Sequence, residues 1–421
     1  MNYRRRPLLL PLFFFTLFLA AQTPATAQTG DDLTIKVAIM GPGSELYFWW
    51  GHIALVIEDN LSGQASFYDY GVFSFDTENF YVNFAMGRLL YSCRASPAEW
   101  NYYEYRRNNR DITLYTLDLP PETREEVWRF AEINVRPENR DYYYHHFKDN
   151  CSTRIRDIVD LATAGQFKES LGEAPSAFTL RQQVRRHTWF DPFMDWLLNF
   201  LMGQEIDVPI TAWQEMFLPQ AVGDYIQDFR YTNILGVDRK LVSDIEIVNR
   251  AVNRPAVLEQ PRRQWIRELI FGLCIAGLLL LLRFFKEIRP GLGGAVWGAV
   301  QGCLGLFFGA AGTVLWFMSF FTNHDYSWHN MNALFVNPLW FAAMVWGFRY
   351  AAAPSFGKRD MPELLLKWFW TAAFALCLLT IPIKLLPFFY QQNQVTQAML
   401  LPITFVLSWF PEWIQEKLKS H

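Results

Sequence analysis

The chain has few cysteines and no excess of positive charge, and each scarcity excludes a class of protein. Its 421 residues include 5 cysteines, too few for a disulfide-rich scaffold. It has 38 Lys and Arg residues and 41 Asp and Glu residues, so the formal net charge is −3. A chain without a basic excess lacks the electrostatic footprint of a nucleic-acid-binding protein, and we expect no nucleic acid partner.

The distribution of apolar residues is more informative than their mean. Mean hydropathy over the whole chain is +0.02, a value typical of neither a water-soluble enzyme nor a membrane protein. Apolar residues are concentrated in one run near the N-terminus and in several runs beyond residue 264. The length allows two or three domains, and these runs divide the chain at residues 1–27, 28–264 and 265–421.

Residues 1–27 have the pattern of a cleavable secretory signal peptide. Three arginines at positions 4–6 precede an apolar run at 8–21, and small residues at 25–27 form an A-x-A cleavage site. We expect cleavage after Ala27, and the alternative is an uncleaved membrane anchor. Residues 28–264 alternate strand-like apolar runs with charged helical stretches, which predicts an exported domain of the α+β class.

The composition of residues 265–421 predicts a transmembrane domain of five helices. Most of the apolar runs approach the roughly 20 residues that a helix needs to span a bilayer, and they cover residues 265–285, 295–321, 331–348, 368–389 and 398–410. Lys and Arg residues follow the first, third and fifth runs, whereas the connections at 322–330 and 390–397 contain neither. This alternation predicts that the 28–264 domain lies outside the cytoplasm and the C-terminus inside.

Two motifs in the 28–264 domain contain residue types suited to nucleophilic catalysis. His52 begins a strand-like apolar run, and Cys151 begins a stretch with apolar residues at helical spacing. Asp149 or Asn150 is positioned as the N-cap of that helix. A helix N-terminus stabilises a thiolate, and a nearby imidazole generates the thiolate and later returns the proton. The pattern predicts a catalytic pair with Cys151 as nucleophile and His52 as base.

A third group usually orients the imidazole of such a pair. We predict that Asp69 has this role, because it lies on the strand-like run that follows His52. Two other interpretations stay open. Cys151 forms a disulfide with Cys93, the other cysteine of the 28–264 domain, or His52 is a structural histidine.

The remaining histidines do not predict a metal site. His145 and His146 are expected to be loop residues, because they lack Cys or His partners at the spacing of zinc ligands. The connection at 322–330 contains His324 and His329, on the same predicted side of the membrane as Cys151. Polar groups at a membrane mouth are candidate functional residues. Two histidines and one aspartate in a loop are weak evidence for a metal, so we expect no metal and no other cofactor.

The order of these motifs resembles the circularly permuted papain-like fold, in which a His strand precedes the Cys helix, as in lecithin–retinol acyltransferase-like enzymes. A wider set resembles the Lnb-type lipoprotein N-acyltransferases over essentially the whole mature chain. These motifs are GHIALV at 51–56, YDYGVF at 68–73, PENR at 137–140, DNCSTR at 149–154, MFLP at 216–219, TNH at 322–324 and NMNAL at 330–334. Cys151 and His52 match the nucleophile and base that the resemblance implies, whereas Asp69 is predicted from its position alone.

The resemblance implies an enzyme of the bacterial inner membrane with its catalytic domain in the periplasm. It implies transfer of an acyl chain from a membrane phospholipid, through a cysteine thioester, to the α-amino group of a diacylglyceryl-cysteine lipoprotein. Two substrates embedded in the bilayer would explain the five helices, which an exported hydrolase does not need. Substrate contacts are predicted at residues of the motifs: Asn150, Tyr68, Tyr70, Arg154, His324, His329 and Asn332.

Two other functions stay open. The same Cys–His chemistry suits an NlpC-type cysteine amidase or endopeptidase that cleaves peptidoglycan and uses the helices only as an anchor. A receptor or assembly factor with a disulfide between Cys93 and Cys151 is the non-enzymatic alternative. Mass analysis of a lipoprotein N-terminus distinguishes the two enzymes, and a count of free thiols tests the third interpretation.

Overall fold

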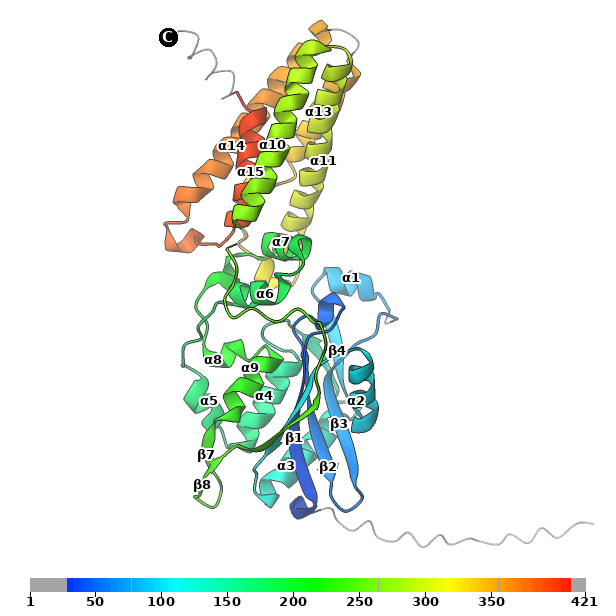
Figure 1. The fold of residues 1–421 in the computed structure, drawn as a ribbon, viewed down its shortest axis with the longest axis vertical. Helices are drawn as coiled ribbons and strands as arrows, with labels where there is room; N and C mark the ends of the chain where they lie inside the picture. The colour runs from blue at the N-terminus through cyan, green and yellow to red at the C-terminus, as the bar shows by residue number, and fades with distance from the viewer. Residues whose placement is uncertain (1–28, 77, 264, 354–355, 410–421) are drawn as a thin grey trace, which may run out of the picture.

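The computed structural model describes residues 29–76, 78–263, 265–353 and 356–409, so the predicted signal peptide at 1–27 lies outside the described residues. Figure 1 shows an elongated molecule with a sheet-containing domain at one end and a bundle of long helices at the other. The N-terminal part combines an antiparallel sheet with helices, and the C-terminal part is helical. The predicted α+β class is therefore confirmed.

A seven-stranded sheet forms the centre of the N-terminal domain. Its order is β6-β4-β3-β2-β1-β5-β9, and every neighbouring pair is antiparallel. The strands are β1 (Leu33–Met40), β2 (His52–Asp59), β3 (Gln64–Val72), β4 (Leu89–Pro97), β5 (Ile112–Leu117), β6 (Asp141–Tyr144) and β9 (Val242–Asn249). A second, two-stranded sheet pairs β7 (Arg230–Thr232) with β8 (Asp238–Lys240).

Helices cover both faces of the central strands. On one face, Ile53, Leu55 and Ile57 of β2 belong to the main core, which includes residues of α3 (Pro121–Asn134), α4 (Cys151–Ala162) and α9 (Pro219–Gln227). On the other face, Ala54 and Val56 pack in a smaller core with α2 (Ala98–Arg107). Because both faces of β2 are buried, its sequence is a continuous apolar run rather than an alternating one.

Short helices complete the N-terminal domain, and two of them reach toward the helical bundle. These two are α6 (Leu180–Thr188) and α7 (Pro192–Leu201), which lie between the sheet and the bundle (Figure 1). Trp196 and Phe200 of α7 are buried in the core of the bundle. The others are α1 (Phe80–Ala85), α5 (Gln166–Leu171) and α8 (Ala212–Glu215).

The C-terminal bundle contains three helices that are long and apolar enough to cross a membrane, namely α10 (Trp265–Ile288), α11 (Leu292–Phe321) and α14 (Asp360–Ile383). They pack with α13 (Trp340–Ala352) and α15 (Gln394–Leu407). Gly305 of α11 lies so close to α13 that an added Cβ would be 2.2 Å from the backbone nitrogen of Met344. Small residues allow helix backbones in membranes to approach in this way.

The third predicted membrane helix differs from the prediction. The run at 331–348 forms two helices, α12 (Asn332–Phe335) and α13, with residues 336–339 between them. Pro338 lies in this break, and proline cannot donate the backbone hydrogen bond that a continuous helix requires. Helices α13 and α15 are each shorter than the roughly 20 residues of a full span. That the chain crosses the membrane five times remains a prediction.

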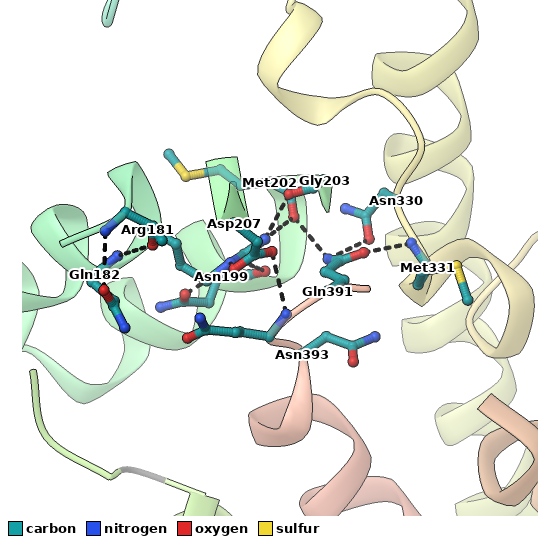
Figure 2. A network of polar contacts seen from close by, with 12 residues as sticks. Arg181, Gln182, Asn199, Met202, Gly203, Asp207, Asn330, Met331, Gln391 and Asn393 are labelled. Carbon is teal, nitrogen blue, oxygen red and sulfur yellow. Dashed lines mark hydrogen bonds and ion pairs between the residues drawn. The ribbon is translucent and has the colours of Figure 1, made fainter. Parts of the chain in front are cut away.

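A buried polar network connects the two parts of the chain, and we call it the joint (Figure 2). Its centre is Arg181 on α6, which is fully buried and whose Nε lies 2.8 Å from Oδ1 of Asp207. The Nη2 group of Arg181 donates to the carbonyl oxygens of Met202 (3.0 Å) and Gly203 (2.7 Å). The guanidinium thus provides hydrogen-bond donors for the backbone carbonyl groups that follow α7.

The same backbone is held from the bundle side. Gln391, between α14 and α15, donates from Nε2 to the Met202 carbonyl at 3.0 Å and accepts from the backbone N–H of Met331 at 2.6 Å. Asn330 and Asn332 both donate to the carbonyl of Phe200, at 2.8 and 2.9 Å. These contacts fix the bundle connections at 322–331 and 384–393 against the N-terminal domain, because buried polar groups that lose their partners are costly.

Candidate active site

The N-terminus of α4 is held by Asn150. The Asn150 side chain accepts hydrogen bonds from the backbone N–H groups of Ser152 (2.9 Å) and Thr153 (3.0 Å), which makes it the N-cap. Its Nδ2 donates to the carbonyl oxygens of His146 (2.8 Å) and Phe217 (2.9 Å). Cys151, the first residue of the helix, is buried. The N-cap therefore positions Cys151 at the positive end of the helix dipole.

His52, at the start of β2, is paired with Asp69 on β3. The Nε2 atom of His52 lies 2.9 Å from Oδ1 of Asp69, and the same oxygen accepts the backbone N–H of Gly71 at 2.7 Å. Gly71 leaves no space beside the imidazole, since an added Cβ would lie 2.5 Å from Cε1 of His52. The carboxylate and the glycine together hold one orientation of the ring. In this orientation Nε2 is hydrogen-bonded to Asp69, and Nδ1 is the ring nitrogen that does not contact the carboxylate.

His52 and Cys151 interact electrostatically. Burial lowers the pKa of His52, but the interactions with Tyr105, Asp69 and Cys151 and the hydrogen bond to Asp69 outweigh it, so the pKa is raised well above its usual value. Within the described residues, no hydrogen bond joins His52 to Cys151. Catalytic hydrogen bonds often tighten only when substrate is bound. The interactions with Tyr105, Asp69 and Cys151 favour the protonated form of the imidazole.

Asp69 is ionised despite its burial. Burial raises its pKa, but the charge of His52, the hydrogen bonds from His52 and Gly71, and the charge of Arg110 lower it, and the net shift is downward. An anionic Asp69 accepts a hydrogen bond from the Nε2–H group and stabilises the imidazolium form of His52. The side chain predicted as the third member of the site therefore contacts His52 in the way that role requires.

Sequence reasoning missed two residues behind this pair. The ring of Tyr105 on α2 stacks on His52 with centroids 6.3 Å apart, and the guanidinium of Arg110 lies 4.8 Å from the centroid of the same Tyr105 ring. Arg110 is buried, and its Nε donates to the carbonyl of Gly41 at 2.8 Å. Burial lowers the pKa of Arg110, yet its positive charge still favours ionised Asp69. A single arginine after a helix forms no sequence motif, so the sequence did not indicate that Arg110 would stabilise ionised Asp69.

Cys93 and Cys151 are both free thiols in the structure. Burial raises the pKa of Cys93 to about 12, with a hydrogen bond from Tyr70 and the charge of Arg154 acting in the opposite direction. A thiol with so high a pKa is uncharged at neutral pH and is a poor nucleophile. Of the two cysteines of the N-terminal domain, Cys151 is the one that lies at a capped helix N-terminus.

Four residues predicted to contact substrate have protein partners. Tyr68 donates to Glu132 on α3 at 2.5 Å, and Tyr70 is buried close to Cys93. Arg154 makes two contacts with Asp149, at 2.6 and 2.8 Å, and its guanidinium lies 4.3 Å from the centroid of the Tyr142 ring. Asn150 is the N-cap described above. Contact of these four with substrate stays a prediction.

The predicted residues of the 322–332 connection lie where the bundle meets the N-terminal domain. His324 is buried and donates from Nε2 to the carbonyl of Phe84 at 3.0 Å, while Nδ1 lies 2.7 Å from the hydroxyl of Tyr326. His329 is exposed, with Nδ1 3.0 Å from Glu205. Asn332 is part of the joint. A substrate role for these residues also stays a prediction.

An unexpected contact joins this connection to the segment before Cys151. Nε2 of His145 lies 2.7 Å from Oδ1 of Asp325, and Lys148 pairs with the other carboxylate oxygen. Nδ1 of His145 accepts two backbone N–H groups, from Phe147 and Lys148, each at 3.1 Å. His145 was expected to be a loop residue without a special role. It connects the bundle to the turn that leads into α4.

Comparison with known proteins shows that the N-terminal part of the chain is similar to a family. Residues 22–186 match the family model described as the Lnb N-terminal periplasmic domain, and this range includes His52, Asp69 and Cys151. No curated protein and no solved structure matches the chain. In the part of the chain that the structure describes, no group of three or more His, Cys, Asp or Glu residues is arranged to hold a metal ion. The match agrees with the resemblance seen in the motifs that lie within residues 22–186, the part of the chain similar to the Lnb N-terminal periplasmic domain family.

Proposed function

We propose that the protein is a thiol acyltransferase that moves an acyl chain from a membrane phospholipid to the α-amino group of a diacylglyceryl-cysteine lipoprotein. The observation that carries the proposal is the pairing of His52 with Asp69 beside a buried cysteine at a capped helix N-terminus. The family match supports Lnb-type lipoprotein N-acylation at the level of the family. The apolar helices α10, α11 and α14 support membrane association.

The first half of the proposed reaction forms a thioester. The Cys151 thiol gives its proton to His52, and the thiolate attacks the ester carbonyl of the phospholipid. Backbone N–H groups at the start of α4 are suited to stabilise the tetrahedral oxyanion. The C–O bond then breaks, the imidazolium of His52 protonates the leaving oxygen, and a lysophospholipid departs. The acyl group remains on Cys151.

The second half transfers the acyl group to nitrogen. The lipoprotein α-amine attacks the thioester carbonyl, and His52 accepts the proton that the amine loses. The C–S bond breaks, the thiolate returns, and a stable amide is released. Asp69 keeps the imidazole oriented through both halves, because its contact with Nε2 leaves Nδ1 for the reacting groups.

The proposed acyl transfer requires that water be kept from the thioester. The contact of Asp325 with His145 and Lys148 brings the connection at 322–330 against the turn before Cys151. The ring of Tyr326 lies 5.5 Å from that of His146 and 5.7 Å from that of Phe147. An outer bundle connection packed on this turn favours a site that receives substrates from the bilayer over one open to the cell wall.

The decisive test replaces the nucleophile. In a strain without lipoprotein N-acylation, the wild-type protein should restore a triacylated lipoprotein N-terminus, as measured by mass spectrometry, and Cys151→Ala should leave it diacylated. Because Cys93 is a buried, uncharged thiol, Cys93→Ala is the matched control and should retain acylation. Triacylation by a well-expressed Cys151→Ala protein would refute the proposal. Cleavage of purified peptidoglycan without lipoprotein acylation would support the amidase alternative.

A further inference from the structure

Helix α1 is attached to the outer end of α11. Helix α11 ends at Phe321, and the backbone N–H of Asn323 donates to the carbonyl of Met86 at 2.9 Å. His324 donates to the carbonyl of Phe84 at 3.0 Å. Gly87, with φ +70°, allows this approach, since an added Cβ would lie 2.9 Å from the carbonyl carbon of Asn323. Helix α11 is apolar up to its last residue, and α1 lies next to the end of the bundle that faces the sheet (Figure 1).

The surface of α1 is unusually apolar for a water-facing element. Its sequence, FYVNFA, has no charged residue. Tyr81 is 76% exposed, Phe84 is 51% exposed, and Val82 and the preceding Phe75 are exposed to a similar degree. Contiguous apolar patches of this kind on a soluble domain mark interaction sites.

The exposed rings continue inward as one series of contacts, which we call the aromatic track. From α1 toward the sheet, the ring centroids of Phe84 and Phe80 are 6.1 Å apart, and those of Phe80 and Phe73 are 6.3 Å apart. Phe73 contacts Tyr91 of β4 at 5.0 Å, and Tyr91 stacks on Tyr144 of β6 at 4.1 Å. The track therefore runs from α1 to β6, the edge strand of the sheet.

The inner end of the aromatic track lies near the nucleophile. Burial raises the pKa of both Tyr91 and Tyr144, and the charge of Cys151 raises each pKa further. The ring of Tyr144 also lies 5.3 Å from that of His146, in the segment that leads to Cys151. The ring contacts of the aromatic track thus connect α1 to the segment that leads to Cys151.

We propose that α1 rests in the outer leaflet and that the aromatic track guides a phospholipid acyl chain from the bilayer to Cys151. Aromatic side chains are favoured at the membrane interface, and apolar helix faces lie in the interface plane. The exposed Arg88, just after α1, is placed to meet the head-group phosphate. This inference identifies the entrance of the acyl donor and rests on the proposed function.

Photocrosslinking in phospholipid vesicles tests the position of α1. Benzoylphenylalanine replaces Tyr81 in the full-length Cys151→Ala protein, so that no acyl transfer is needed for the readout. The matched control replaces Trp100, which is 60% exposed. It lies on α2, a helix that is farther from the bundle than α1 (Figure 1). A phospholipid adduct at position 81, absent at position 100, is expected. Adducts only to protein, or no adduct at position 81, would overturn the inference.

A second variant links the surface to the reaction. Tyr81→Glu places a charge where the aromatic track meets the bilayer, and it should slow thioester formation from vesicle phospholipid at least about tenfold. Trp100→Glu should leave the rate unchanged, and an equal rate in Tyr81→Glu would refute a role of the track. Lipid adducts at position 81 without lipoprotein acylation by the wild type would instead refute the proposed function and leave the membrane contact intact.

Discussion

Asp69 contributes to both the orientation and the protonation of His52. Its carboxylate occupies Nε2 and contributes to the raised pKa of the imidazole. Asp69 itself is kept ionised by His52, by the backbone N–H of Gly71 and by Arg110, which together outweigh the effect of burial. A carboxylate in this position orients the ring and stabilises the imidazolium form. The residue thus affects both the geometry and the protonation of the proposed base.

Asp69→Asn should change the pH profile as well as the rate. The amide can still accept a hydrogen bond from Nε2, but the negative charge is lost, so the pKa of His52 should fall. The alkaline limb of thioester formation should then move to lower pH, because the imidazolium of the thiolate pair loses its proton earlier. We expect the rate at neutral pH to fall by up to about 10²-fold, the lower end of what general acid–base catalysis contributes.

Single-turnover labelling with phospholipid across a pH series measures this effect. Asp244→Asn, on an exposed position of β9, is the control and should leave the profile unchanged. An unshifted alkaline limb in Asp69→Asn, with wild-type rates, would exclude Asp69 from the site and leave its contact with His52 a structural one.

At the scale of elements, the important feature is how α4 begins. Asn150 makes two acceptor contacts as N-cap and two donor contacts to carbonyl groups of separate segments. One of these carbonyls belongs to Phe217, 67 residues farther along the chain. The cap therefore ties the Cys151 helix to the loop before it and to the segment before α9.

Asn150→Ala should destabilise the domain and displace Cys151. Loss of an N-cap costs about 1–2 kcal/mol, and each buried carbonyl left without a donor costs about 1 kcal/mol more. The free energy of unfolding should fall accordingly in denaturant titrations, and lipoprotein acylation should fall with it.

Thr179→Ala is the matched control for this cap. Thr179 caps α6 by accepting the backbone N–H of Gln182. Its loss should cost about 1 kcal/mol without affecting acylation. Equal losses of acylation in the two variants would show that stability, rather than the position of Cys151, limits the reaction.

Strands and helices were predicted correctly where the local sequence pattern matches the burial of the residues in the structure. The apolar run after His52 is β2, and the helical spacing after Cys151 is α4, capped by one of the two residues proposed for it. The run at 331–348 was predicted as one helix because hydropathy does not register a break at Pro338. The contact between His145 and Asp325 spans 180 positions, so local pattern contained no information about it.

At the scale of the whole molecule, the joint decides how the proposed catalytic domain sits on the bundle. Its ion pair between Arg181 and Asp207 is almost completely buried. The backbone of Gln392, from the connection between α14 and α15, donates to the second oxygen of Asp207 at 3.2 Å. The carboxylate of Asp207 therefore contacts both parts of the molecule, and the two parts are joined here by a packed, hydrogen-bonded connection.

Asp207→Asn should destabilise the full-length protein strongly. It removes one charge of a buried pair and leaves Arg181 uncompensated, which typically costs about 3–5 kcal/mol. The exposed pair of Arg230 with Asp238 provides the control, since Asp238→Asn should cost about 1 kcal/mol or less. Thermal unfolding of the detergent-purified proteins compares the two. Similar stability of both variants would contradict the assignment of the joint as a fixed connection.

The sequence alone determined the features that depend on local composition and spacing. These are the division between an α+β domain and an apolar C-terminal part, and the candidate residues His52 and Cys151 with their strand and helix. Only the tertiary structure decided which unforeseen groups meet: Arg110 behind His52 and Asp69, Asp325 against the turn before Cys151, and α1 at the end of α11. The reason is that side-chain pairing across the sheet and between domains depends on packing in three dimensions, which periodicity along one chain does not encode.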